Sequence, residues 1–236
     1  QRIRPGVTAA QAARAYLCDR AREATVLGLE DGRVDRLLGL VLGHTHDFYR
    51  APITRHFQQL AIGSASVSRT YGVDPDFECP AYLLQHDRPL LAAATRAHLR
   101  RNATDGNIGI ALFTARPSLP PVEVGTDLIG YSPEAEMARK LVELGDYPII
   151  GLGKVAWLAG EVNGDTATLV KPSPVQALAA IGAAHSGVER DALLAAFALT
   201  ERDEVQAPLA DLASTTVHVF EDTVGGIAAV VRAVHL

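Results

Sequence analysis

The chain has 236 residues, of which 48% are hydrophobic, and a formal net charge of −5 at pH 7. We expect a folded protein with one large domain and a small one. The acidic balance argues against a nucleic-acid partner, because phosphate backbones are held by surplus Lys and Arg. No apolar run reaches the roughly 18 residues of a membrane span, so we expect no membrane partner. Cys18 and Cys79 have neither metal-ligand nor disulfide-framework spacing, which indicates a reducing compartment and predicts a cytoplasmic location.

Residues 1–86 have a mostly helical pattern. Thr8 is a candidate N-cap for a helix over residues 9–22, and further helices are predicted over 34–42 and 56–62. Because no extended buried strand is visible here, residues 1–86 are predicted to form a small α-helical domain.

Residues 87–236 alternate helices with short apolar runs, a pattern typical of a parallel sheet flanked by helices. The predicted strands are 108–113, 147–151 and 217–220. The predicted helices are 87–102, 134–144, 154–159, 175–184, 190–199 and 227–234. An Asn-Gly turn within 161–169 predicts a β-hairpin. The region is therefore predicted to be an α/β domain with a Rossmann-like sheet.

Three motifs follow in this region. Thr114 ends the first predicted strand, Lys171 stands directly before Pro172 at a helix start, and Glu221 and Asp222 end the last strand. The carboxyl ends of parallel strands meet at one edge of a sheet. A hydroxyl, an ammonium and two carboxylates at that edge predict a phosphate and Mg²⁺ site.

The phosphate would be held by the first two motifs. The Thr114 hydroxyl and the Ala115 N–H are candidate donors, Lys171 supplies a compact positive charge, and Arg116 is a candidate anion ligand. Each has an ordinary structural alternative. A strand-end threonine often caps a turn, and a lysine before proline or an arginine after a strand is often solvated.

The metal would be held by Glu221 and Asp222, through oxygen ligands and water. Gly225 and Gly226 leave room for close backbone approach beside it. The structural alternative is that the two carboxylates cap the helix that follows.

In this order, segments 108–114, 169–174 and 217–222 resemble the later motifs of the haloacid-dehalogenase-like (HAD) superfamily, over residues 87–236. The resemblance implies a HAD-like α/β core, with residues 1–86 as a helical cap domain. It also implies a Mg²⁺-dependent phosphohydrolase acting on a small phosphorylated metabolite, with Thr114 and Lys171 as catalytic residues.

The family's first motif, a strand followed by Asp-x-Asp-Gly that holds the nucleophile, is not found. One interpretation is that it precedes Gln1, since the chain does not begin with Met. Another is that residues 24–35 are a decayed form, with Leu29 at the nucleophile's position. A third is that this stretch is a helix-to-helix turn at Asp31-Gly32.

Two further functions stay open. The chain could be a catalytically inactive relative that binds a phosphorylated ligand or a protein partner. Alternatively, His44 and His46 after an apolar run resemble the first metal-ligand motif of amidohydrolase-type metalloenzymes. Such enzymes need later His and Asp ligands, and only His218 lies in a predicted strand.

Overall fold

A computed structural model of the chain describes residues 47–106, 108–125 and 129–236, with isolated positions before residue 47. The helices predicted over 9–22 and 34–42, the stretch 24–35, and His44 and His46 lie outside these ranges. The chain divides into two compact units, Gln1–Leu60 and Ala61–Leu236. The domain boundary predicted after residue 86 falls within the second unit and stays a prediction.

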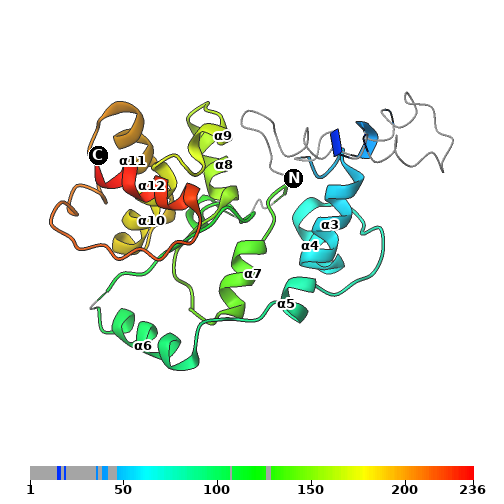
Figure 1. Ribbon diagram of the computed structural model, residues 1–236, viewed down its shortest axis with the longest axis horizontal. Helices are drawn as coiled ribbons and strands as arrows, with labels where there is room; N and C mark the ends of the chain where they lie inside the picture. Colours follow the sequence, from blue (N-terminus) through cyan, green and yellow to red (C-terminus); the bar gives the residue numbers. More distant parts are fainter. Residues whose placement is uncertain are drawn as a thin grey trace. The chain divides into compact units, whose positions relative to one another are not determined.

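Helices form most of the described chain, and Figure 1 labels them along the sequence. The helices are α3 (Pro52–Ile62), α4 (Ser64–Tyr71), α5 (Tyr82–His86), α6 (Ala93–Thr104), α7 (Glu134–Leu141), α8 (Leu152–Glu161), α9 (Thr166–Leu169), α10 (Val175–Ser186), α11 (Glu189–Arg202) and α12 (Val224–Val234), with a 3₁₀ turn η2 (Val122–Val124). The strands are β1 (Leu112–Phe113) and β2 (Ile149–Ile150). None of the described helices is both long and apolar enough to cross a membrane.

The predicted Rossmann-like α/β fold is wrong. Within the described residues the one sheet has two short parallel strands, β1 and β2, with Leu112 opposite Ile149. The predicted strand 217–220 is an irregular segment that makes no backbone–backbone hydrogen bond within the described chain. A strand is defined by bonds to a neighbour, so apolar composition alone does not produce one. The described chain is a helical protein with a minimal sheet.

The predicted β-hairpin over 161–169 is also wrong. The Asn-Gly turn follows the end of α8, with Asn163 at φ 51°, and the chain then enters α9. Asp165 caps this helix, because its Oδ1 accepts the N–H of Ala167 at 2.9 Å. Similarly, the helix predicted from residue 87 begins only at Ala93, and Leu90 before it is 98% exposed.

The helices predicted over 134–144, 175–184 and 190–199 are confirmed by α7, α10 and α11. The helix predicted over 56–62 is part of α3, and α8 is longer than the predicted 154–159.

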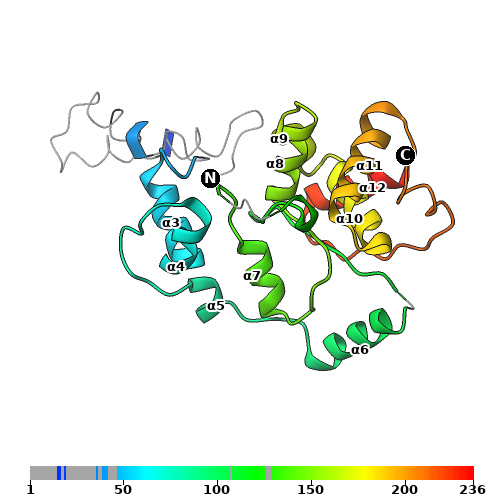
Figure 2. The same ribbon diagram turned by 180° about the vertical axis from the view of Figure 1, so that it is seen from behind.

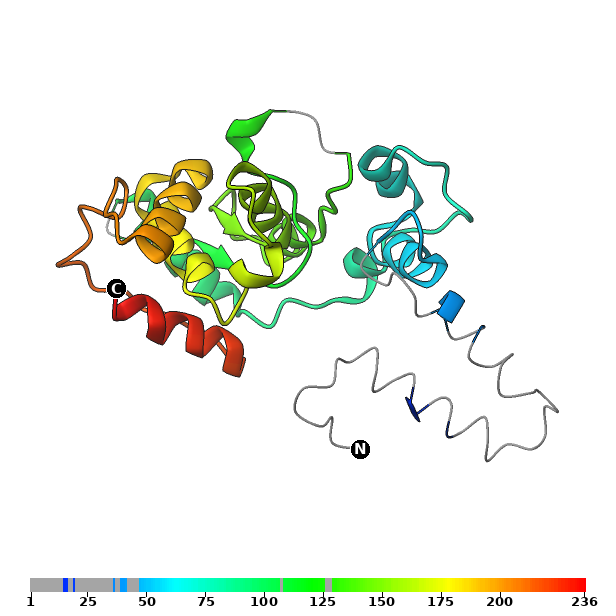
Figure 3. The same cartoon turned by 90° about the horizontal axis from the view of Figure 1, so that it is seen from above.

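The core of the second unit surrounds α10. This helix is apolar on nearly all sides, as expected for a helix buried all round. Gly182 of α10 lets α11 approach closely, since a Cβ there would lie 3.2 Å from the Ala192 Cβ. Figures 1 and 2 show α10 beside α11 from two sides, and α12, in red beside the C label in Figure 3, packs against α10. The two strands pack against α10, which fixes where β1 ends.

Candidate functional site

A pocket of about 590 Å³ opens where β1 ends. It is lined by three segments that are far apart in the sequence. They are residues 113–117, Lys171 and residues 220–223. All six residues predicted to form the site, Thr114, Ala115, Arg116, Lys171, Glu221 and Asp222, are among those that line it.

Thr114 extends the backbone hydrogen bonding between β1 and β2 by one residue beyond the end of β1. Its N–H donates to the Ile150 carbonyl at 3.0 Å, and its carbonyl accepts Nε2 of Gln176 at 2.7 Å. The Thr114 Oγ1 accepts the Arg116 N–H at 3.2 Å, so the hydroxyl turns the chain out of the sheet. Its own proton remains available to a ligand, which makes Thr114 both a turn residue and a candidate donor.

Lys171 is one of the two cations that line the pocket, and its side chain is 12% exposed. Its Nζ lies 2.6 Å from Oε2 of Glu221 and 3.9 Å from the centre of the Phe113 ring. The ammonium thus has a carboxylate and an aromatic face as its neighbours. The structural alternative of a solvated lysine is therefore not what the structure shows.

Glu221 is held at both oxygens. Oε2 accepts Lys171, and Oε1 accepts the N–H and the hydroxyl of Thr223 at 2.9 and 2.6 Å. Burial raises the pKa of Glu221, but the hydrogen bonds from Lys171 and Thr223 outweigh it, and the pKa falls from 4.5 to about 2. The carboxylate is thus ionised at any physiological pH.

The residues at the start of α12 pack closely against the Glu221 carboxylate. Thr223 is the N-cap, and its Oγ1 accepts the Gly226 N–H at 3.0 Å. A Cβ at Gly226 would lie 2.1 Å from Cδ of Glu221, so only glycine leaves room for this arrangement. Gly225 is different, because a Cβ there would meet Lys171 Cβ at an ordinary 3.9 Å.

Two charged groups are less firmly held. Asp222 is exposed and makes no hydrogen bond or ion pair with other described residues. The Arg116 guanidinium lies 3.7 Å from the Asp87 carboxylate, with both side chains nearly half exposed. Both groups are therefore accessible to a ligand in the pocket.

The oxygen donors of the pocket meet part of what the predicted Mg²⁺ site requires. In the described ranges no three His, Cys, Asp or Glu residues gather as a metal cage. Mg²⁺, however, is commonly bound by one or two carboxylates together with water and a phosphate oxygen. With Mg²⁺ bound, Asp222 would serve as a direct ligand, and Glu221 would contribute through water because its Oε2 accepts Lys171.

Sequence reasoning missed the groups that support the site. Thr223 fits the N-cap preference for threonine before a helix. Gln176, fully buried, is the one polar side chain inside an otherwise apolar stretch of α10. The aromatic rings of Phe113 and Phe220, which precede Thr114 and Glu221, also line the pocket.

The chain was compared with known proteins. No family model matches it, no curated protein matches it, and no solved structure matches it.

Proposed function

We propose that the pocket binds the phosphate group of a small phosphorylated metabolite. The observation that supports this most strongly is the meeting of Thr114, Lys171 and Glu221, from three distant segments, in one pocket. Lys171 is the less exposed of the two cations that line it, at 12% against 46% for Arg116, and the pocket is open at the surface to a small ligand.

The roles follow from the contacts. The ammonium of Lys171 pairs with phosphate oxygens, and the Thr114 hydroxyl and Ala115 N–H donate to them. Arg116 is close enough to the rim to add a bidentate contact in exchange for its loose pairing with Asp87.

Mg²⁺ fits the same proposal. The ion would be held by Asp222, with Glu221 and a phosphate oxygen completing part of its shell, and it would neutralise charge on the phosphate. Glu221, ionised and already turned into the pocket, lies where it can serve either the cation of Lys171 or a metal.

Calorimetric titration with inorganic phosphate, with and without Mg²⁺, tests the proposal. Lys171→Met should lower the phosphate affinity by roughly tenfold or more, because it removes a charge-assisted contact worth about 1.5–3 kcal/mol. Lys140→Met is the matched control, since Lys140 is exposed on α7 and outside the pocket. Equal affinities for the two variants would refute the assignment.

A second candidate function is hydrolysis of the phosphate ester. Beside a nucleophile, phosphoryl transfer needs a cation, a hydroxyl donor and carboxylates for Mg²⁺, and this pocket has each of them. The two lining carboxylates are Glu221 and Asp222, of which Glu221 is engaged by Lys171 and Thr223. Hydrolysis therefore requires a nucleophile other than Glu221.

Assay of small phosphate monoesters with Mg²⁺ separates the two functions. Turnover that Lys171→Ala lowers by roughly 10²–10³-fold supports hydrolysis. Phosphate binding without turnover of any ester supports a binding function alone.

A further inference from the structure

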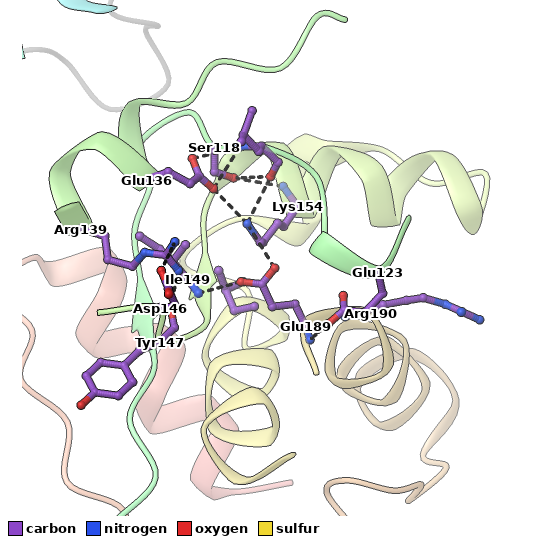
Figure 4. A network of polar contacts seen from close by, with 12 residues as sticks. Ser118, Glu123, Glu136, Arg139, Asp146, Tyr147, Ile149, Lys154, Glu189 and Arg190 are labelled. Atoms are coloured by element: carbon purple, nitrogen blue, oxygen red, sulfur yellow. Dashed lines mark hydrogen bonds and ion pairs between the residues drawn. The ribbon is translucent and has the colours of Figure 1, made fainter. Parts of the chain in front are cut away.

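A second polar cluster lies beside the loop that leaves the pocket. Lys154, at the start of α8, has a side chain only 2% exposed. Its Nζ lies 3.1 Å from Oε1 of Glu136, 3.3 Å from Oε2 of Glu189 and 3.3 Å from the Leu119 carbonyl. Figure 4 shows Lys154 between the two glutamates. The ammonium donates to Glu136 Oε1 and to the Leu119 carbonyl, while Glu189 Oε2 is an ion-pair partner that accepts no hydrogen bond from the described residues. We call Lys154, Glu136 and Glu189 the Lys154 cluster.

The Lys154 cluster forms hydrogen bonds with the end of the loop 116–119. The Leu119 N–H donates to both oxygens of Glu136, at 3.2 and 3.1 Å, while the Leu119 carbonyl accepts Lys154. Ser118 Oγ accepts the backbone N–H of Lys154 at 3.3 Å and donates to the Leu119 carbonyl at 3.1 Å. Both backbone groups of Leu119 are therefore held by charged side chains.

The beginning of the loop is held by backbone bonds to the same two helices. The Arg116 carbonyl accepts the N–H of Leu152, and the Pro117 carbonyl accepts the N–H of Ala135, each at 2.9 Å. Leu152 begins α8 and Ala135 is in the first turn of α7.

Glycine lets α8 come this close. A Cβ at Gly153 would lie 1.8 Å from the Ser118 carbonyl oxygen, and one at Gly151 would lie 2.5 Å from Ser118 Cβ. The loop and the start of α8 are in direct contact, with no room for even a methyl group between them.

The third member ties the cluster to the sheet. Glu189 Oε1 accepts the N–H of Ile149 in β2 at 2.8 Å, while its Oε2 faces Lys154. Because β2 pairs with β1, the Lys154 cluster joins the strand that leads to Thr114 with the loop that follows it.

Buried charges are a costly way to stabilise a fold, since apolar side chains of similar volume often do as well or better. Here the charged groups make directional bonds to specific backbone groups. Glu136 and Lys154 bond to Leu119 in the loop, and Glu189 bonds to the Ile149 N–H in β2.

We propose that Glu136 and Lys154 are positioning residues for the pocket, which hold loop 116–119 so that the Ala115 N–H and the Arg116 side chain face the ligand. They do not line the pocket themselves. This inference rests on the proposed phosphate binding, because phosphate is the ligand whose affinity reports the loop's position.

The most informative variant is Glu136→Ala. It removes the acceptor of the Leu119 N–H but leaves Lys154 paired with Glu189, so one cation and one carboxylate remain together. Lys154→Met would instead leave two carboxylates facing each other without a cation. Glu136→Gln keeps an acceptor oxygen for Leu119 and serves as the conservative rescue. Leu199→Ala, in α11, is the control for general loss of stability.

Calorimetric titration with inorganic phosphate should show roughly tenfold weaker binding by Glu136→Ala, the lower end of the loss when a group that orients a binding residue is removed. Glu136→Gln should bind within about twofold of wild type, and Leu199→Ala should bind normally while unfolding at lower temperature. Unchanged affinity in Glu136→Ala, or an equal loss in Leu199→Ala, would overturn the proposal.

Amide hydrogen exchange of Leu119 and Leu152, whose N–H groups donate to Glu136 and to the Arg116 carbonyl, separates this inference from the proposed function. If wild type binds no phosphate, the proposed function fails, and exchange alone decides the positioning role. Faster exchange at both amides in Glu136→Ala but not in Leu199→Ala supports it. Equal exchange in the two variants overturns it.

Discussion

Lys171 and Glu221 lie 50 positions apart in the chain and form an ion pair of 2.6 Å, with side chains 12% and 8% exposed. The pair joins the segment before α10 to the start of α12. It also neutralises the cation of the pocket, so an incoming phosphate has to compete with Glu221 for the ammonium.

Removing that competitor should strengthen anion binding. We predict that Glu221→Gln raises the affinity for phosphate in the absence of Mg²⁺ by about fivefold, or about 1 kcal/mol, the size of an ion pair near a protein surface. The same change should weaken Mg²⁺ binding, because it removes a carboxylate. Titration calorimetry with each ion measures both. Glu201→Gln, an exposed change of the same charge in α11, is the control. A fall in phosphate affinity would contradict the prediction.

The ion pair also predicts a dependence of stability on pH. The pKa of Glu221 is lowered from 4.5 to about 2 in the folded state, so its stabilising contribution is full above about pH 4.5. The contribution is lost as the pH falls from there towards about 2, because the unfolded chain takes up the proton first. We therefore expect the free energy of unfolding of wild type to fall towards that of Glu221→Gln over this range. Urea unfolding at several pH values measures it, and parallel curves for the two proteins would contradict it.

The two glycines of α12 provide a matched pair. Gly225→Ala should stabilise the protein by roughly 0.5–1 kcal/mol, because alanine is the better helix former and meets only an ordinary contact. Gly226→Ala should destabilise it by about 1–3 kcal/mol, because the new methyl group overlaps the Glu221 carboxylate. Denaturant unfolding measures both changes. Similar effects from the two substitutions would show that Glu221 does not occupy the described position.

Sequence patterns predicted the helices better than they predicted the sheet. Helices such as α10 and α11 make their hydrogen bonds locally, so periodicity and end signals suffice to find them. A strand needs a partner elsewhere in the chain. Residues 217–220 have the composition of a strand and no partner within the described residues.

The predicted site residues meet in one pocket although the predicted sheet is wrong. Thr114 is placed by the short ladder to Ile150, and Glu221 by the turn into α12 and the pair with Lys171. The Lys154 cluster had no local signal, because Lys154 meets Glu136 and Glu189 only once α7, α8 and α11 have packed.

Gln176 should be essential to the position of Thr114. Its Nε2 donates to the carbonyls of Thr114 and Ile150, at 2.7 and 3.0 Å, and no other described group donates to the Thr114 carbonyl. We predict that Gln176→Met, which keeps the volume but leaves that carbonyl without a donor, destabilises the protein by about 1–3 kcal/mol and weakens phosphate binding. Denaturant unfolding and phosphate titration measure the two effects. Gln85→Met, at an exposed position of α5, should change stability by less than about 0.5 kcal/mol. If Gln176→Met weakens neither stability nor binding, the Thr114 carbonyl has another donor and the hydroxyl is placed by the ladder alone.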